Sequence, residues 1–304
     1  MKPFPRGVYP TMVTPFTADN KVDYNGVLEI IQWYEKKKVD GIFAICQSSE
    51  IFFLSFEERL ELLKFILANR PAGMPIIASG HVADDIPTQL KEAKILIEAG
   101  ADAYIFISNR FASQEQDDAL FLRNLLAAAD VLDNIPLGIY ECPFPYKRLI
   151  TPDAMREIAA TGRFAFLKDT CCDLPQIAQK LEAAKGTPMQ IYNAHSGSLL
   201  ESLRLGCAGF SGVMANFHPE LYVELCKIYD SDPERAQKIQ DFVGFASLAE
   251  LQLYPVNAKY HLMLDGVKIN YFTRSKNHND FIAPRKMEIE QMYRTTQRFI
   301  QTVL

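Results

Sequence analysis

Short apolar runs alternate with segments of helical periodicity along most of this chain, and this alternation constrains its fold more than any other feature. The apolar runs have the length and composition of strands buried on both faces of a sheet. Each run is followed by a segment with apolar residues at helical spacing, and the pattern occurs eight times between residues 7 and 230. The predicted strands are residues 7–14, 41–46, 75–79, 102–107, 136–140, 164–168, 189–192 and 209–213.

The segments between these runs carry helix-start and helix-stop signals. Ser55 precedes a carboxylate at the third helical position, which is typical of a capping box, and Thr151 precedes a proline at the first helical position. Gly100 follows a periodic segment, as glycines do at helix ends. Two predicted helices therefore begin after Ser55 and after Thr151. The others are residues 23–38, 84–99, 115–132, 173–185 and 197–205.

Eight strand–helix units in sequence predict an α/β protein with a closed (β/α)8 TIM barrel. The alternative is a doubly wound open sheet, but no Gly-x-Gly-x-x-Gly motif follows the first predicted strand. We assign residues 1–230 to the barrel. Residues 231–304 show helical periodicity at 236–251, 255–264 and 285–304, with a polar loop at 270–284, and are predicted to form a helical extension packed on the barrel.

The composition excludes several classes of function. The chain has 304 residues, of which 48% are hydrophobic, and a formal net charge of −5, so it has no basic surface for nucleic acid or for anionic membranes. No run is long enough to span a bilayer, and the first residues lack the apolar run of a signal peptide. Its six cysteines are too sparse for a disulfide framework and include no Cys-x-x-Cys pair. We expect a reduced, cytoplasmic protein without a metal or organic cofactor.

Two neighbouring predicted strands end in titratable residues, Tyr140 and Lys168. If the strands are parallel neighbours, these ends lie about 5 Å apart. A lysine with a pKa lowered by apolar surroundings can attack a carbonyl to form a Schiff base, and a phenol can move the protons that this step requires. Alternatively, Lys168 extends out of the strand end to solvent and Tyr140 is an ordinary core aromatic.

The other strand ends supply further candidates, because barrel enzymes place their chemistry at the carboxyl ends of their strands. His195 lies at such an end and is either an acid or base near neutral pH or a plain hydrogen-bonding partner. Glu141 follows Tyr140, so its side chain points the opposite way; it either contacts a polar substrate or is solvated. The remaining positions at strand ends are Thr14, Cys46–Glu50, Ser79, Ser108–Phe111 and Ser211.

Together these residues resemble the dihydrodipicolinate synthase and N-acetylneuraminate lyase family, which are class I aldolases on a (β/α)8 barrel. Each landmark of the resemblance is weak alone, but their order and the spacing of the tyrosine and lysine are specific to the superfamily. They are Thr14-Pro15-Phe16, Gln47-Ser48-Ser49-Glu50, Leu54-Ser55, residues 99–103, Tyr140-x-x-Pro143, Lys168-Asp169, Gly209-x-x-Gly212-Val213, Ala215-Asn216 and Pro219.

The resemblance implies roles for the residues that match. Lys168 is expected to form the Schiff base with the keto carbon of pyruvate or another 2-keto acid, and Tyr140 to relay protons. The turn after the second strand is expected to bind the keto acid's carboxylate. The residues predicted to bind substrate are Gln47, Ser48, Ser49, Phe111, His195 and Ser211. The resemblance also implies a homo-oligomer, a dimer or tetramer, and no metal.

This chain departs from the synthase pattern around the expected site. Gln47 replaces a hydroxyl residue, Phe111 replaces a tyrosine, and Pro145 stands where the synthases carry an arginine that grips the aldehyde's carboxylate. Lys147 or Arg148 can substitute for that arginine only by turning into the site. We therefore expect an aldolase or lyase acting on pyruvate or a sugar-derived 2-keto acid. The alternatives are a dehydratase using the same iminium, a 4-hydroxy-tetrahydrodipicolinate synthase, and a non-catalytic keto-acid-binding protein.

Overall fold

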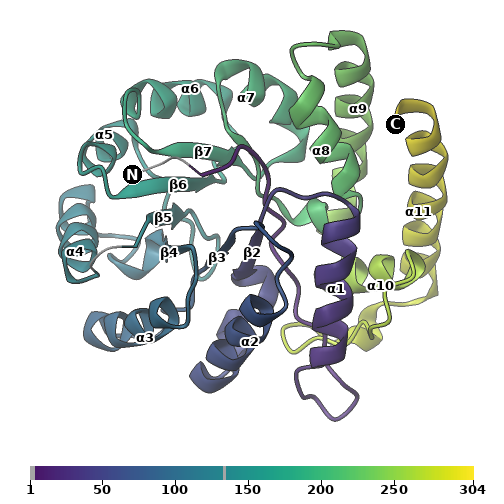
Figure 1. Ribbon diagram of the computed structural model, residues 1–304, viewed down its shortest axis with the longest axis horizontal. Coiled ribbons are helices and arrows are strands. Elements are labelled where there is room, and N and C mark those ends of the chain that lie inside the picture. Colours follow the sequence, from purple (N-terminus) through teal and green to yellow (C-terminus); the bar gives the residue numbers. More distant parts are fainter. Residues whose placement is uncertain (1–3, 133–134) are drawn as a thin grey trace.

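The computed structural model describes residues 4–132 and 135–304, in which eight parallel strands form a central sheet with helices around it (Figure 1). Neighbouring strands follow the order β1-β8-β7-β6-β5-β4-β3-β2. The strands are β1 (Gly7–Val8), β2 (Ile42–Ile45), β3 (Ile76–Ala78), β4 (Ala103–Ile107), β5 (Leu137–Tyr140), β6 (Phe164–Asp169), β7 (Gln190–Asn193) and β8 (Gly209–Phe210).

A helix follows each strand and covers the outside of the sheet, as the eight predicted strand–helix units require (Figure 1). At the start of α5, the Thr151 side chain accepts a hydrogen bond from the backbone N–H of Ala154. The capping box at Ser55 also forms, with Glu58 as its partner. The helices are α1 (Tyr24–Lys36), α2 (Phe56–Ala68), α3 (Ile86–Glu98), α4 (Asp118–Val131), α5 (Pro152–Ala160), α6 (Leu174–Ala183), α7 (Leu199–Leu205) and α8 (Pro219–Ile228).

The first and last parts of the sheet meet through the chain that follows β1. The backbone N–H of Met12 donates to the carbonyl of Phe43 at 3.0 Å, and the N–H of Phe43 donates to the carbonyl of Pro10 at 3.0 Å. Because β1 also pairs with β8, the strands close into a (β/α)8 barrel, and the open-sheet alternative is wrong. The prediction of a regular strand over residues 7–14 was also wrong: β1 ends at Val8, because Pro10 has no N–H to donate.

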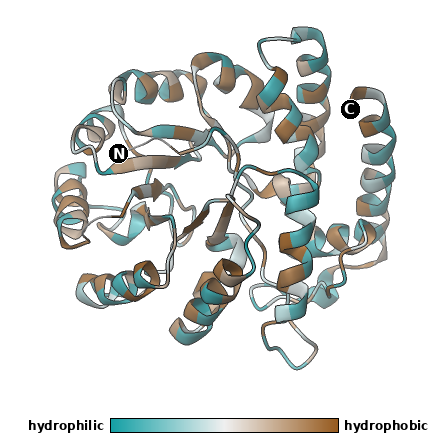
Figure 2. Cartoon of the chain, viewed as in Figure 1, coloured by the Kyte–Doolittle hydropathy of each residue, from teal (hydrophilic) through white to brown (hydrophobic). Residues whose placement is uncertain are grey.

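Aromatic side chains fill the inside of the barrel. The ring of Phe166 stacks on that of Tyr192 with centroids 4.1 Å apart, and Tyr9 meets the Phe166 ring edge-on at 5.4 Å. Phe4 packs against Phe166 and covers the amino end of the barrel. In Figure 2, the strands are mostly brown, which marks hydrophobic residues, whereas the helices around them carry both hydrophobic and hydrophilic residues. Because side chains fill the amino end of the barrel, we look for a ligand-binding site at the carboxyl end, where barrel enzymes have their active sites.

The last part of the chain forms α9 (Pro233–Ala246), α10 (Val256–Leu264) and α11 (Ala283–Val303) beside the barrel (Figure 1). The helix predicted over residues 236–251 ends earlier, and its last five residues form the 3-10 turn η6 (Ser247–Leu251). The chain thereby leaves the helix before Pro255, whose ring disfavours a helical residue in front of it. The division of the chain into a barrel over residues 1–230 and an extension over residues 231–304 stays a prediction. Residues 1–3 of the predicted barrel lie outside the described residues. None of the described helices is long and apolar enough to cross a membrane.

Candidate active site

Tyr140 and Lys168 lie side by side at the carboxyl ends of β5 and β6, where they are directly paired in the sheet. The Lys168 Nζ atom is 4.8 Å from the centre of the Tyr140 ring. It donates a hydrogen bond of 2.6 Å to the backbone carbonyl of Ser211, on the chain just after β8. Only 3% of Lys168 is exposed, and among the described residues it forms no ion pair. The lysine therefore does not extend out of the strand end to solvent.

The surroundings of Lys168 favour its neutral amine. Burial lowers its pKa to about 8, because the ammonium loses its hydration, and the thiols of Cys46 and Cys142 and the carboxyl groups nearby only partly oppose this. A free amine near neutral pH is the form of lysine that attacks carbonyl carbons. In its neutral form, the Lys168 amine is therefore able to attack a carbonyl carbon.

The Tyr140 hydroxyl donates a hydrogen bond of 3.1 Å to Oε1 of Gln47, in the 3-10 turn η1 (Gln47–Ser49) after β2. Burial raises the pKa of Tyr140 well above its usual range, so the phenol keeps its proton. The Cys142 thiol donates to the same Gln47 oxygen at 3.3 Å. Gln47, one of the three residues that depart from the synthase pattern, therefore orients the phenol that lies beside Lys168.

A cavity of about 470 Å³ opens at this end of the barrel. Of the residues predicted for the site, it is lined by Lys168, Tyr140, Gln47, Ser48 and His195. Its remaining walls come mainly from the loop after β5 and from the chain beyond α9. The fold therefore brings five of the eight predicted site residues into one cavity, although they come from four different strands.

The structure does not bring Ser49, Phe111 or the Ser211 side chain to this cavity. The Ser49 hydroxyl is bonded within the barrel wall, to the carbonyls of Met12 at 2.8 Å and Ala44 at 2.7 Å. Phe111 is buried against Phe106, with ring centres 5.1 Å apart. The Ser211 hydroxyl donates to the carbonyl of Tyr9 at 2.9 Å, so Ser211 contacts Lys168 through its backbone alone. Position at a strand end did not reveal these side-chain directions.

His195 lines the cavity and is half-buried. Its Nδ1 lies 2.9 Å from the hydroxyl of Ser198, which leaves Nε2 as the atom that can act on a ligand. Burial, and next the charge of Lys147, lower its pKa, so the ring is neutral at neutral pH. In this form His195 can accept or donate a hydrogen bond to a ligand.

The chain beyond α9 supplies cavity residues that no sequence pattern indicated. The cavity is also lined by Glu250 and Leu251 from η6 and by Tyr254, and Ser275 and Lys276 add a second segment. These residues lie in the predicted extension, far in sequence from every strand end. Only the packing of the extension over the barrel's carboxyl end places them in the site.

Glu50 holds this second segment against the barrel. Its Oε1 pairs with Nζ of Lys259 at 2.8 Å, while its Oε2 accepts hydrogen bonds from the backbone N–H groups of Arg274 at 2.8 Å and Ser275 at 2.7 Å. Lys259 also donates to the carbonyl of Phe272 at 2.7 Å. Since Glu50 directly follows the η1 turn, this network fixes the extension beside Gln47 and Ser48.

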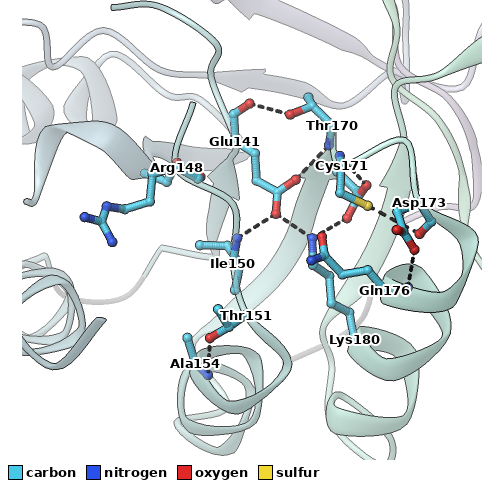
Figure 3. A network of polar contacts seen from close by, with 12 residues as sticks. Glu141, Arg148, Ile150, Thr151, Ala154, Thr170, Cys171, Asp173, Gln176 and Lys180 are labelled. Carbon is cyan, nitrogen blue, oxygen red and sulfur yellow. Dashed lines mark hydrogen bonds and ion pairs between the residues drawn. The ribbon is translucent and has the colours of Figure 1, made fainter. Parts of the chain in front are cut away.

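Glu141 is neither solvated nor turned to a substrate, so both predictions for it were wrong (Figure 3). Its side chain points away from Tyr140, as strand alternation requires, but α6 covers that face. Nζ of Lys180, on α6, lies 2.6 Å from Oε1 of Glu141 and 2.6 Å from Oδ2 of Asp169, and all three side chains are buried. We refer to Glu141, Asp169 and Lys180 as the buried charge cluster.

The buried charge cluster also organises the walls of the cavity. Glu141 accepts hydrogen bonds from the backbone N–H groups of Ile150 at 2.8 Å and Thr170 at 2.7 Å (Figure 3). It thereby ties the loop after β5 to the end of β6. In that loop, Arg148 pairs with Asp118 at 3.0 Å, outside the cavity, whereas Lys147 lines it. Arg148 is thus held away from the position expected for the synthases' arginine.

A family model described as the Dihydrodipicolinate synthetase family matches residues 4–275 of this chain. Among curated relatives, the 4-hydroxy-tetrahydrodipicolinate synthase of Haloarcula marismortui is 28% identical over 239 residues, which cover 78% of this chain and 76% of the relative. The synthase of the same name from Clostridium perfringens strain 13 is 27% identical over 224 residues, covering 74% of this chain and 75% of the relative.

Solved structures share the fold over nearly the whole chain. YagE, a prophage protein of E. coli K12 from the dihydrodipicolinic acid synthase family, solved in complex with pyruvate, superposes with a TM-score of 0.86. It is 21% identical, and the match covers 96% of this chain and 98% of YagE. CdNal of Clostridium difficile, solved in complex with mannosamine, has a TM-score of 0.84 at 20% identity, covering 96% of this chain and 99% of CdNal.

The family match covers most of the barrel and includes every residue that lines the cavity except Lys276. The lysine and tyrosine at the strand ends stand where the resemblance expected them. The chain therefore belongs to the dihydrodipicolinate synthetase family and is an enzyme, a Schiff-base-forming aldolase or lyase related to its synthases.

Proposed function

We propose that this enzyme uses Lys168 as the nucleophile that forms a Schiff base with pyruvate or a sugar-derived 2-keto acid. The observation that carries the proposal is the pair of Lys168 and Tyr140 in one cavity, with Lys168 buried and joined to no carboxylate among the described residues. Such a lysine keeps part of its amine free near neutral pH. A lysine with only a packing role would not be expected to line a cavity of this size together with a tyrosine.

The geometry supports the following steps. The Lys168 amine attacks the keto carbon: its lone pair forms the C–N bond, the C=O π electrons move to oxygen, and one proton of the nitrogen passes to that oxygen to make a hydroxyl. The Tyr140 phenol, held by Gln47, donates the proton with which this hydroxyl leaves as water. The resulting iminium accepts electrons from a bond to the neighbouring carbon. An aldol bond at that carbon can then break or form through an enamine.

We place the substrate's carboxylate at the η1 turn, next to Lys168. Gln47 and Ser48 line the cavity there, and the Ser48 hydroxyl lies 3.1 Å from that of Thr11. Hydroxyl and backbone N–H donors can hold a carboxylate without a charged side chain. Ser49 supports this turn through its hydrogen bonds within the barrel wall. Phe111 packs against Phe106 instead, and His195 contacts the remote part of the substrate.

The loss of a relay hydroxyl at Gln47 and of the gripping arginine at Pro145 argues against the synthase reaction that gives the curated relatives their names. Dehydration of a 2-keto sugar acid needs the same iminium and is the closest variant. A non-catalytic binder does not need the retained lysine and tyrosine. A homo-oligomer, either dimer or tetramer, and a cytoplasmic location are further parts of the proposal.

Borohydride trapping tests this function directly. Incubation with pyruvate or another 2-keto acid and then borohydride is expected to add the reduced mass of that acid at Lys168, located by peptide mass spectrometry. Lys168→Ala should abolish both trapping and turnover. Lys91→Ala, at an exposed position on α3, is the matched control and should be trapped like the parent. Trapping at another lysine, with Lys168→Ala still active, would contradict the assignment.

A further inference from the structure

The cavity contains a carboxylate that the steps above do not use. Glu250 comes from η6, in the chain beyond α9, and lines the same cavity as Lys168 and Tyr140. It is half-buried, and no hydrogen bond or ion pair to its carboxylate is found among the described residues. Burial raises its pKa above the usual range, partly opposed by the charge of Lys168. A carboxylate that lines the cavity without a protein partner can accept a proton from a ligand and give it back.

The other acidic groups of the cavity are occupied. Glu50 forms an ion pair with Lys259 through Oε1 and accepts two backbone hydrogen bonds through Oε2. Both carboxylate oxygens are therefore engaged by the protein and are poorly placed to accept a proton from a substrate. The Tyr140 phenol keeps its proton, because burial raises its pKa, and directs it to Gln47. An amide oxygen such as that of Gln47 cannot pass a proton on, so this hydrogen bond gives Tyr140 no route for sending a proton taken from a substrate onward.

We propose that Glu250 is the catalytic base that removes the proton from carbon 3 of the iminium and the acid that later gives this proton to the oxygen of the new aldol hydroxyl. The inference rests on the proposed function, because it needs the iminium on Lys168. It assigns the two halves of the chemistry to two groups. Tyr140 serves the formation of the iminium, whereas Glu250 serves the carbon atom that makes or breaks the aldol bond.

The step balances without a further reactant. The C3–H bond of the iminium breaks, its electron pair forms the C2–C3 double bond, and the C–N double-bond electrons return to nitrogen. The proton moves to a carboxylate oxygen of Glu250. When the enamine carbon adds to an aldehyde, the carboxylic acid of Glu250 gives this proton to the oxygen that becomes the new hydroxyl. Cleavage follows the same path in reverse, and Glu250 ends unchanged.

Two measurements with pyruvate separate this role from iminium formation. Borohydride trapping reports the iminium, and exchange of the pyruvate methyl protons in D2O, followed by proton NMR, reports the enamine. Glu250→Gln is expected to be trapped at a rate within about threefold of the parent, while methyl exchange falls roughly 100- to 10,000-fold. Glu98→Gln, at an exposed position at the end of α3, is the matched control and should change neither rate.

The outcomes distinguish the two proposals. Exchange by Glu250→Gln within about threefold of the parent overturns the role of Glu250, and so does loss of trapping together with exchange, because Glu250 then acts before the enamine. Loss of exchange in His195→Asn, with Glu250→Gln unaffected, transfers the role to His195. A parent enzyme that pyruvate does not label overturns the inference outright, and failure of every 2-keto acid to label Lys168 overturns the proposed function itself.

Discussion

Lys168 and Lys180 are both buried, but their surroundings have opposite effects. Lys168 lies inside the barrel's carboxyl end, where its hydrogen-bond acceptor is a backbone carbonyl at 2.6 Å. Lys180 lies between α6 and the strands, where two carboxylates approach it at 2.6 Å. Burial alone favours the neutral amine of both, yet the pKa of Lys168 is lowered, and the charges of Glu141 and Asp169 raise that of Lys180.

Lys259 is an intermediate case that explains the difference. It has one carboxylate, that of Glu50 at 2.8 Å, and burial still lowers its pKa to about 8. At Lys259, the single carboxylate does not outweigh the loss of hydration, to which the charge of Arg274 adds a smaller lowering effect, whereas the two carboxylates around Lys180 do outweigh it. The number of carboxylates beside a buried lysine therefore helps to set whether its pKa is lowered or raised, while its role also depends on whether it lines the cavity, as Lys168 does.

The first test removes the Tyr140 hydroxyl beside Lys168, the proposed catalytic lysine. Tyr140→Phe keeps the ring beside Lys168 but cannot donate to Gln47 or to the leaving water. Turnover is expected to fall roughly 100- to 10,000-fold, since a positioned acid or base contributes that much. Steady-state kinetics with an accepted 2-keto acid measure this, with circular dichroism to show that the fold is retained. Activity within a few-fold of the parent would assign the proton transfer to another group.

The second test removes the charge of the structural lysine. Lys180→Met leaves Glu141 and Asp169 buried without their cation, and the free energy of unfolding is expected to fall by about 3–5 kcal/mol. Urea denaturation measures the change. Adding Glu141→Gln to this variant should restore part of the loss, because it removes one of the two uncompensated charges. A loss below about 1 kcal/mol in the single variant would show that the buried charge cluster carries little stability.

The third test uses pH to read the state of the nucleophile. Below pH 8, the neutral fraction of Lys168 falls tenfold for each pH unit, so the rate of borohydride trapping should rise with pH at that slope and level off above about pH 8. A lysine with an ordinary pKa gives a rate that continues to rise beyond pH 10. Initial trapping rates at constant ionic strength measure the profile. A rate that keeps rising through pH 10 would remove the contrast with Lys180.

Much of the fold followed from local patterns. The apolar strand segments, the caps at Ser55 and Thr151 and the alternation of strand and helix depend on neighbouring residues in the chain, so they are visible in its order. The pairing of Tyr140 with Lys168 also followed, because parallel neighbours bring their carboxyl ends to the same edge. Side-chain directions in the turns, such as those of Ser49 and Phe111, depend on contacts that local order does not specify.

The sequence by itself determined the barrel and the placement of the lysine and tyrosine at the carboxyl ends of its strands, because strand and helix periodicities record which faces are buried. Only the tertiary structure decided what surrounds these two residues. Glu141 became buried because α6 brings Lys180 to the face that strand alternation left outside. Glu250 entered the cavity because the chain beyond α9 packs over the barrel's carboxyl end. Both contacts join segments far apart in the chain, and the pKa of each group follows from those contacts and from burial rather than from its neighbours in sequence.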